Sequence, residues 1–127
     1  MSKKLEDIFK TKKVLIVDDE EMIREILQEE FMDYGTDVTT AMNGEEAFKI
    51  LECNSFDFIV CDMKMPNGSG EWLLYQLKEK KIKFNNFFLC TGFITMPEEE
   101  LKSLSVSDVI KKPFDFKSML ITISKYF

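Results

Sequence analysis

Short apolar stretches alternate along this chain with longer stretches in which apolar residues recur at helical spacing. Residues 14–17 form a continuous apolar run rich in β-branched side chains, which is typical of a strand buried on both faces of a parallel sheet. Apolar runs also predict strands at 56–61, 87–90 and 109–110, and residues 36–41 (Thr-Asp-Val-Thr-Thr-Ala) suit a short second strand. The chain is therefore predicted to contain five strands.

Helices are predicted in the segments that separate and follow these strands. The first has an apolar stripe that ends before Gly35, a residue suited to the end of a helix. The residues of this stripe that we expect to face the core are Ile23, Ile26, Leu27, Phe31 and Tyr34. Asn43 and Glu46 have the spacing of a capping box and predict the start of the second helix.

Three more helices are predicted further along the chain. The third ends in a basic run at 78–83, and its apolar residues are Trp72, Leu73, Leu74 and Leu77. The fourth is expected to be short and to begin with Thr95 and Glu98 as a capping pair. The apolar residues of the last helix are Phe116, Leu120, Ile123 and Phe127.

The order of these elements predicts the fold class. Strands separated by single helices indicate βαβ units, which place the strands parallel and the helices on both faces of the sheet. We therefore expect an α/β fold with an open, doubly wound, five-stranded parallel sheet.

Composition narrows the possible functions. The chain has 127 residues, enough for one domain with its own core, and a net charge of −6, which argues against direct nucleic-acid binding. Because it has no histidine, it has no Ser-His or Cys-His catalytic pair and no His-liganded zinc. Its isolated cysteines, Cys53, Cys61 and Cys90, offer no disulfide framework and fit a reducing compartment.

No apolar run exceeds four residues, so membrane insertion is not expected. The Lys-rich segment 1–12 lacks the apolar core of a signal peptide and is expected to be a solvated lead-in. Together with the cysteine pattern, this predicts a cytoplasmic protein.

Polar residues follow the predicted strands at their carboxyl ends, where a doubly wound sheet forms its working crevice. Asp18 and Asp19 follow the first strand, Asp62 the third, Thr91 the fourth and Lys112 the fifth. Three carboxylates in one place raise one another's pKa unless a cation lies among them. Carboxylate oxygens suit Mg²⁺, and a carboxylate beside Mg²⁺ and a lysine can act as a nucleophile towards a phosphoryl group.

These residues and their neighbours resemble the receiver domain of bacterial response regulators, in particular of the chemotaxis type. The resemblance runs from about Lys13 to the C-terminus and keeps the order of the family's motifs. Those motifs are Asp18-Asp19, the D-x-x-M-P-x-x-x-G pattern from Asp62 to Gly70, Thr91-Gly92 and Lys112-Pro113-Phe114. The resemblance implies a flavodoxin-like sheet with strand order 2-1-3-4-5.

The resemblance also implies a role for each site residue. Asp62 would accept a phosphoryl group from a histidine kinase or a histidine phosphotransfer protein. The implied Mg²⁺ ligands are Asp18, Asp19, Asp62 and Lys64, the last through its backbone carbonyl. Lys112 would pair with the phosphoryl oxygens, next to a cis Lys112–Pro113 bond. Thr91 would turn its hydroxyl to the new phosphoryl group and pull its loop inward.

Two residues depart from the family's pattern. Val109 stands where the family has a switch aromatic, so a signal to the last two helices would use other groups, such as Phe93 or Phe114. Lys64 places a positive charge two residues after the acceptor, and we predict that Lys64→Asn changes the lifetime of the phosphoryl group.

Residues 1–127 are thus expected to form a single receiver domain with its core at 13–127 and no output domain. It would act as a phosphorylation-dependent signalling switch of a two-component system, changing its affinity for a downstream protein. Beyond its own phosphotransfer and dephosphorylation, no enzymatic turnover is expected. Phosphorylation-dependent dimerisation is a further possibility that the family implies.

Two alternatives use the same residues. A phosphate-independent docking module would keep the acidic pocket without the switch. A Mg²⁺-dependent phosphohydrolase would also use an aspartate nucleophile, but such enzymes usually have a second aspartate at the position of Lys64. Flavin binding is disfavoured because Asp18-Asp19 would repel the phosphate of the cofactor.

Overall fold

The computed structural model describes residues 4–92 and 96–127, and its sheet has the predicted strands. They are β1 (Lys13–Val17), β2 (Asp37–Ala41), β3 (Phe58–Asp62), β4 (Asn86–Thr91) and β5 (Asp108–Lys111). All neighbours pair in parallel, in the order β2-β1-β3-β4-β5. The predicted fold class and the strand order that the resemblance implied are both confirmed.

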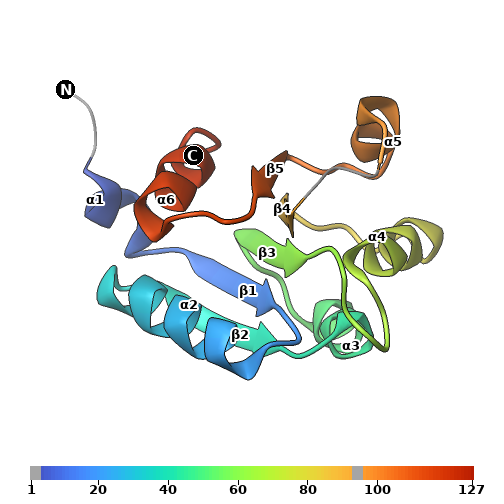
Figure 1. Ribbon diagram of the computed structural model, residues 1–127, viewed down its shortest axis with the longest axis horizontal. Coiled ribbons are helices and arrows are strands. Elements are labelled where there is room, and N and C mark those ends of the chain that lie inside the picture. Colours follow the sequence, from blue (N-terminus) through green and yellow to red (C-terminus); the bar gives the residue numbers. More distant parts are fainter. Residues whose placement is uncertain (1–3, 93–95) are drawn as a thin grey trace.

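Six helices lie within the described residues, one more than predicted. They are α1 (Leu5–Phe9), α2 (Glu21–Asp33), α3 (Gly44–Cys53), α4 (Gly70–Glu79), α5 (Glu98–Ser103) and α6 (Phe116–Ser124). Helices α1, α2 and α6 cover one face of the sheet, and α3, α4 and α5 cover the other (Figure 1). In the described parts of the chain, no helix is both long and apolar enough to span a membrane.

The alternation of side chains along β1 explains why both faces are covered. Val14 and Ile16 point into the cluster under α1, α2 and α6, whereas Leu15 and Val17 point into the cluster under α3 and α4. All four side chains are at most 1% exposed. A continuous apolar run is therefore what this central strand requires.

The N-terminal segment is not the solvated lead-in that the sequence predicts. Its described part forms α1, and the side chain of Phe9 has no exposed surface. The Phe9 ring packs edge-on or tilted against Phe31, Phe58 and Phe127, with centroids 5.8–6.5 Å away. The hydroxyl of Thr36 also donates to the carbonyl of Phe9 at 3.0 Å. The hydrophobic core therefore begins before residue 13.

Two details of the predicted helices are also wrong. Ile26 is 48% exposed, because the side of α2 that contacts the sheet is narrower than its apolar stripe. Helix α6 ends at Ser124, so Phe127 lies beyond it, although its ring still contacts Phe9 and Phe58. The predicted stop at Gly35 is confirmed: this residue has φ +82°, and its N–H donates to the carbonyl of Met32 at 2.9 Å.

The capping predictions had mixed outcomes. The side chain of Asn43 accepts the N–H of Glu46 at 2.8 Å, and the Glu46 carboxylate accepts the N–H of Met42 at 3.0 Å, which confirms the cap of α3. Helix α5 is short, as expected, but Pro97 occupies its N-cap position with no side-chain hydrogen bond. Thr95, predicted for this role, lies outside the described residues.

Candidate functional site

The candidate site lies at the carboxyl edge of the sheet, where parallel strands deliver their last residues to one place. Asp62 and Thr91 are the final residues of β3 and β4, and Asp18 and Lys112 directly follow β1 and β5. Backbone hydrogen bonds extend the ladder past the strand ends, from Lys112 N to Thr91 O at 2.8 Å and from Asp18 N to Ala41 O at 3.1 Å. The sheet itself therefore fixes the backbone of these residues.

Three carboxylates meet here as the sequence predicts. Asp18, Asp19 and Asp62 each offer one oxygen, and these oxygens lie within 4.8 Å of one another. Asp18 is 5% exposed and Asp62 is 9% exposed, whereas Asp19 is exposed. Two of the three negative charges are thus held largely away from water, where like-charge repulsion is screened least.

Lys112 contacts the candidate phosphoacceptor directly. Its Nζ lies 3.0 Å from Oδ1 of Asp62 and forms a charge-assisted hydrogen bond with it. The Lys112–Pro113 peptide bond is cis, as the resemblance implied. The lysine joins the site from the last strand, 50 residues after Asp62.

The pKa values of Asp18 and Lys112 follow from this arrangement. Burial raises the pKa of Asp18, the hydrogen bond from the N–H of Glu20 opposes this, and the charge of Asp62 adds to the increase. For Lys112, burial lowers the pKa, but the hydrogen bond to Asp62 and the nearby carboxylates outweigh it and raise the pKa above its ordinary value. Both pKa values are therefore raised in part by the other carboxylates of the site.

Two close backbone contacts hold the loop between β3 and α4. A Cβ atom on Gly70 would lie 2.6 Å from the carbonyl oxygen of Asp62, so only glycine fits beside Asp62. The N–H of Gly44 donates to the carbonyl of Gly68 at 2.7 Å, which joins the start of α3 to this loop. Gly70 belongs to the quoted motif, whereas the role of Gly44 was missed because its partner is distant in the sequence.

Arg24 is a second residue that sequence reasoning missed. Its Nη1 donates to the backbone carbonyl of Asp18 at 2.7 Å and so ties α2 to the end of β1. The available signal was that Arg24 is the only basic residue in the acidic stretch 18–33. The guanidinium group of Arg24 therefore lies near the carboxylates, but it contacts the backbone carbonyl of Asp18 and not a carboxylate.

A cavity of about 270 Å³ opens over the site. Asp19, Asp62, Lys64, Thr91 and Lys112 line it, so five of the six predicted site residues face one space. Thr91 is 5% exposed and Lys64 is exposed at the rim. Asp18 does not line this cavity, but one of its carboxylate oxygens lies within 4.8 Å of an oxygen of Asp19 and of Asp62.

The residues present fit a divalent cation of the Mg²⁺ type. Three carboxylates meet here, Asp62 forms an ion pair with Lys112, and the burial of Asp18 and Asp62 makes negative charge at this place unfavourable without a cation. All donors are oxygens and include no sulfur or imidazole, which is the ligand set of a hard cation. The backbone carbonyl of Lys64 stays a proposed ligand.

The sequence is similar to a known protein family and to individual proteins. Residues 14–124 match the family described as the response regulator receiver domain. The alkaline phosphatase synthesis transcriptional regulatory protein PhoP of Bacillus subtilis is 38% identical over 108 residues, or 81% of this chain and 43% of that protein. The response regulator SaeR of Staphylococcus aureus is 32% identical over 111 residues, or 87% and 48%. The chain spans less than half the length of either relative.

Solved structures agree with these matches. The response regulator TrrA of Thermotoga maritima, in complex with Mg²⁺-BeF, is 32% identical with a TM-score of 0.76, covering 91% of this chain and 99% of that one. The chemotaxis protein CheY4 of Vibrio cholerae is 30% identical with a TM-score of 0.78, covering 91% and 98%.

Proposed function

The chain belongs to the response regulator receiver domain family, and from this premise we propose that it is a phosphorylation-dependent switch whose acceptor is Asp62. Receiver domains of response regulators are signalling switches phosphorylated by histidine kinases. The observation that supports Asp62 most directly is its contact with Lys112 at 3.0 Å inside the three-carboxylate cluster. Among the three carboxylates, Asp62 both lines the cavity and binds the lysine.

The proposed step moves one phosphoryl group from a histidine of the partner to Asp62. A carboxylate oxygen of Asp62 attacks phosphorus, the P–N bond breaks, and the imidazole nitrogen of the donor keeps the electron pair and takes a proton. The product is an acyl phosphate on Asp62. Lys112 stays beside it and neutralises charge on the phosphoryl oxygens. Attack by water later releases inorganic phosphate and restores the carboxylate.

Asp18, Asp19, Asp62 and the carbonyl of Lys64 would hold the Mg²⁺ in this proposal. When bound, the ion would offset the charge of the acidic residues and of the incoming phosphoryl group. The buried Asp18 would keep its hydrogen bond from the N–H of Glu20, which fixes the orientation of its carboxylate.

Thr91 would convert the chemical event into a change of shape. It ends β4 and lines the same cavity as Asp62, so its hydroxyl can turn to an oxygen of the phosphoryl group. The loop that follows leads to α5 and would move with it. Val109, at the position of the family's switch aromatic, is half-buried and has no ring. Phe93, one of the two aromatic candidates, lies outside the described residues. The other candidate, Phe114, follows Lys112 by two residues and would respond to the movement of Thr91.

The kinase would dock beside α2. An apolar groove of about 530 Å³ runs between α2 and the segment after Lys112, lined by Ile23, Ile26 and Phe114 among others. The groove includes the exposed side chain of Ile26, and Glu20 and Lys112 line both this groove and the cavity over Asp62. A histidine-bearing helix seated there would lie close to the acceptor.

The proposal is tested by intact-mass spectrometry after incubation with acetyl phosphate and Mg²⁺. We expect one added phosphoryl group on the wild type, none with EDTA and none on Asp62→Asn. Asp33→Asn, at an exposed position at the end of α2, is the matched control and should be modified like the wild type.

The other outcomes would overturn the proposal in different ways. A folded wild type that binds Mg²⁺ but gains no phosphoryl group would indicate a docking module without the switch. Steady release of phosphate from unrelated phosphoesters would indicate a phosphohydrolase. Modification that persists in Asp62→Asn would place the acceptor elsewhere.

A further inference from the structure

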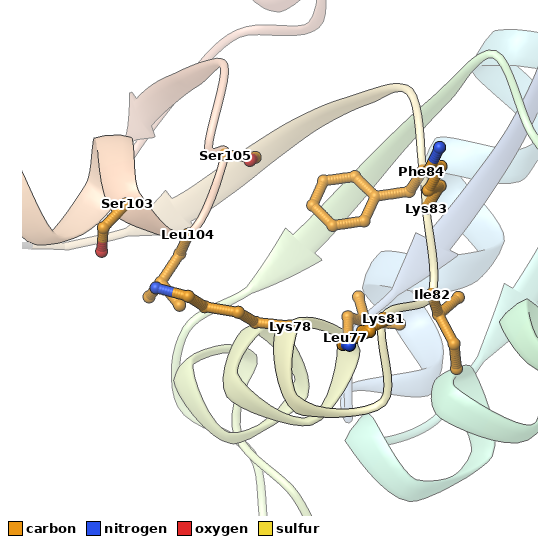
Figure 2. Close-up of a pocket in the computed structure, with 9 residues that line it drawn as sticks. All are labelled: Leu77, Lys78, Lys81, Ile82, Lys83, Phe84, Ser103, Leu104 and Ser105. Carbon is orange, nitrogen blue, oxygen red and sulfur yellow. The ribbon is translucent and has the colours of Figure 1, made fainter.

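A second concave region lies at the opposite, amino edge of the sheet, far from the carboxylates. It is a pocket of about 470 Å³ between the C-terminal ends of α4 and α5 and the loops that lead from them into β4 and β5. Figure 2 shows Lys78 extending from α4 towards Leu104 and the ring of Phe84 projecting between the two loops. Its apolar floor consists of Leu77, Ile82, Phe84 and Leu104.

The rim of this pocket is basic, although the protein as a whole has a charge of −6. Lys78, Lys81 and Lys83 line it together with the hydroxyl-bearing Ser103 and Ser105, and no carboxylate lines it. Within the described residues, none of these three lysines forms a salt bridge. The helix dipole accounts for a lysine in the last turn of α4, such as Lys78, but not for Lys83 beyond it.

The backbone at the pocket shows that two of these side chains are retained at a conformational cost. Lys81 has φ +56° and Ser105 has φ +63°, a region that favours glycine. Both occupy the same position, the left-handed residue that closes a helix. The N–H of Ile82 donates to Leu77 O at 2.9 Å, and the N–H of Val106 donates to Leu101 O at 3.0 Å.

Glycine would close both helices more easily, yet a lysine and a serine stand there and face the same space. Of the three non-glycine residues with positive φ in the described chain, two line this pocket. Unfavourable backbone conformations concentrate at functional sites, where the side chain is needed. The lysine and serine at the rim are therefore explained by a ligand better than by the fold.

We propose that this pocket binds a peptide segment of a partner protein in which bulky apolar side chains are flanked by carboxylates. The apolar floor would take one or two side chains such as Leu or Phe, since pockets of this size bury groups of that volume. The unpaired lysines of the rim would bind the flanking carboxylates and set the direction of the segment. The three rim lysines select a segment that carries carboxylates, and the apolar floor selects one that also carries bulky apolar side chains.

Binding is measured by fluorescence anisotropy with a labelled peptide in which Leu-Phe has two Glu residues on each side. The unphosphorylated protein without Mg²⁺ is used, so the result does not depend on whether Asp62 is the acceptor. We expect saturable binding with a Kd below about 1 mM. A peptide with Lys in place of Glu, and one with Gly-Ser in place of Leu-Phe, should each bind at least about tenfold more weakly.

Variants of the basic run locate the site. Lys81→Glu should weaken binding about tenfold, whereas Lys80→Glu, in the same run but not lining the pocket, should change it less than about twofold. Lys81→Gly distinguishes a binding role from a structural one. It should weaken peptide binding, while the melting temperature of the protein should stay equal or rise. A lysine kept only for the helix end would give no loss of binding in Lys81→Gly.

Four other results would also overturn the proposal. They are no binding of the acidic peptide, equal losses in Lys80→Glu and Lys81→Glu, equal binding of the Gly-Ser peptide, and self-association of the wild type that Lys81→Glu abolishes. The third would indicate an anion site only, and the fourth, seen by sedimentation, would show that a second copy of the chain covers the pocket.

Discussion

At the carboxyl edge of the sheet, Asp18 and Asp62 are buried, and Lys112 forms an ion pair with Asp62. At the amino edge, three exposed lysines lie above an apolar floor: Lys78, Lys81 and Lys83. Both edges concentrate charge of one sign, but only the first also removes it from water. Burial strengthens each electrostatic interaction and shifts the pKa of Asp18 and Lys112. Exposed charge on an apolar surface is suited to recognition instead.

Two helices connect the edges. Helix α4 begins at Gly70 beside the carbonyl of Asp62 and ends at the pocket, and α5 follows the loop after Thr91 and ends at the same pocket. The hydroxyl of Tyr75 on α4 also donates to the carboxylate of Glu100 on α5. The carboxylate site and the basic pocket are therefore separated by the length of these two helices.

The largest effect is expected from the amino edge, on stability rather than binding. Phe9→Ala removes a fully buried ring from the aromatic cluster beneath α1 and should lower the free energy of unfolding by about 4 kcal/mol. Urea unfolding measures this, with the exposed Lys10→Ala as control at less than about 0.5 kcal/mol. Equal stability of both variants would show that the N-terminal segment is a solvated lead-in after all.

The next largest effect is expected on the rate of phosphorylation, where Lys112 is compared with its neighbour Lys111. Lys112→Gln removes the charge that contacts Asp62 and should slow phosphorylation by acetyl phosphate about 100-fold. Lys111→Gln, exposed one residue earlier, is the matched control and should react like the wild type. The rate is followed by intact mass over time, and similar rates for both variants would contradict the role of Lys112.

A smaller effect tests the crowding of the carboxylates. Asp18→Asn keeps an acceptor for the N–H of Glu20 but removes a buried charge, so without Mg²⁺ it should raise the melting temperature by about 3 °C near neutral pH. Because the folded state raises the pKa of Asp18, the wild type loses stability as the pH rises from about 4 through that raised pKa. The advantage of the variant should therefore vanish in acid.

Calorimetry at several pH values, with Asp33→Asn as control, measures this difference. Added Mg²⁺ should stabilise the wild type and not Asp18→Asn. A variant that is less stable than the wild type at every pH without Mg²⁺ would show that the carboxylates do not repel one another.

The smallest effect concerns the backbone at the pocket. Lys81→Gly relieves a left-handed conformation worth about 1–2 kcal/mol and adds chain entropy to the unfolded state, for a net gain near 0.5 kcal/mol. Lys80→Gly, where φ is −85°, gains no such relief and should be destabilising. Urea unfolding should show a higher free energy of unfolding for Lys81→Gly and a lower one for Lys80→Gly. A lower value in both variants would show that the backbone of Lys81 is not strained.

The strands and the site could be predicted because they depend on local signals. A parallel strand buried on both faces needs an uninterrupted apolar run, and Asp18, Asp62 and Thr91 stand where such runs stop, whereas Lys112 follows the last run after Lys111. Topology then brings strand ends to one edge whatever the details of packing. The family resemblance added the roles, which remain proposals for each residue.

The parts that were missed depend on distant contacts. Phe9 looks like one apolar residue in a lysine-rich segment, and only Phe31, Phe58 and Phe127 make it part of the core. Ile26 continues an apolar stripe, but the sheet does not extend beneath it. The basic run 78–83 was visible, whereas its alignment with Ser103 and Ser105 follows from how α4 and α5 end.

Locating the phosphoryl group in the chain distinguishes Asp62 from the other two carboxylates. Borohydride reduces an acyl phosphate on aspartate to homoserine, which tandem mass spectrometry of peptides can locate. After treatment with acetyl phosphate and Mg²⁺, we expect homoserine at the position of Asp62 and not at Asp18 or Asp19. Homoserine at either of those positions, or at none of the three, would contradict it.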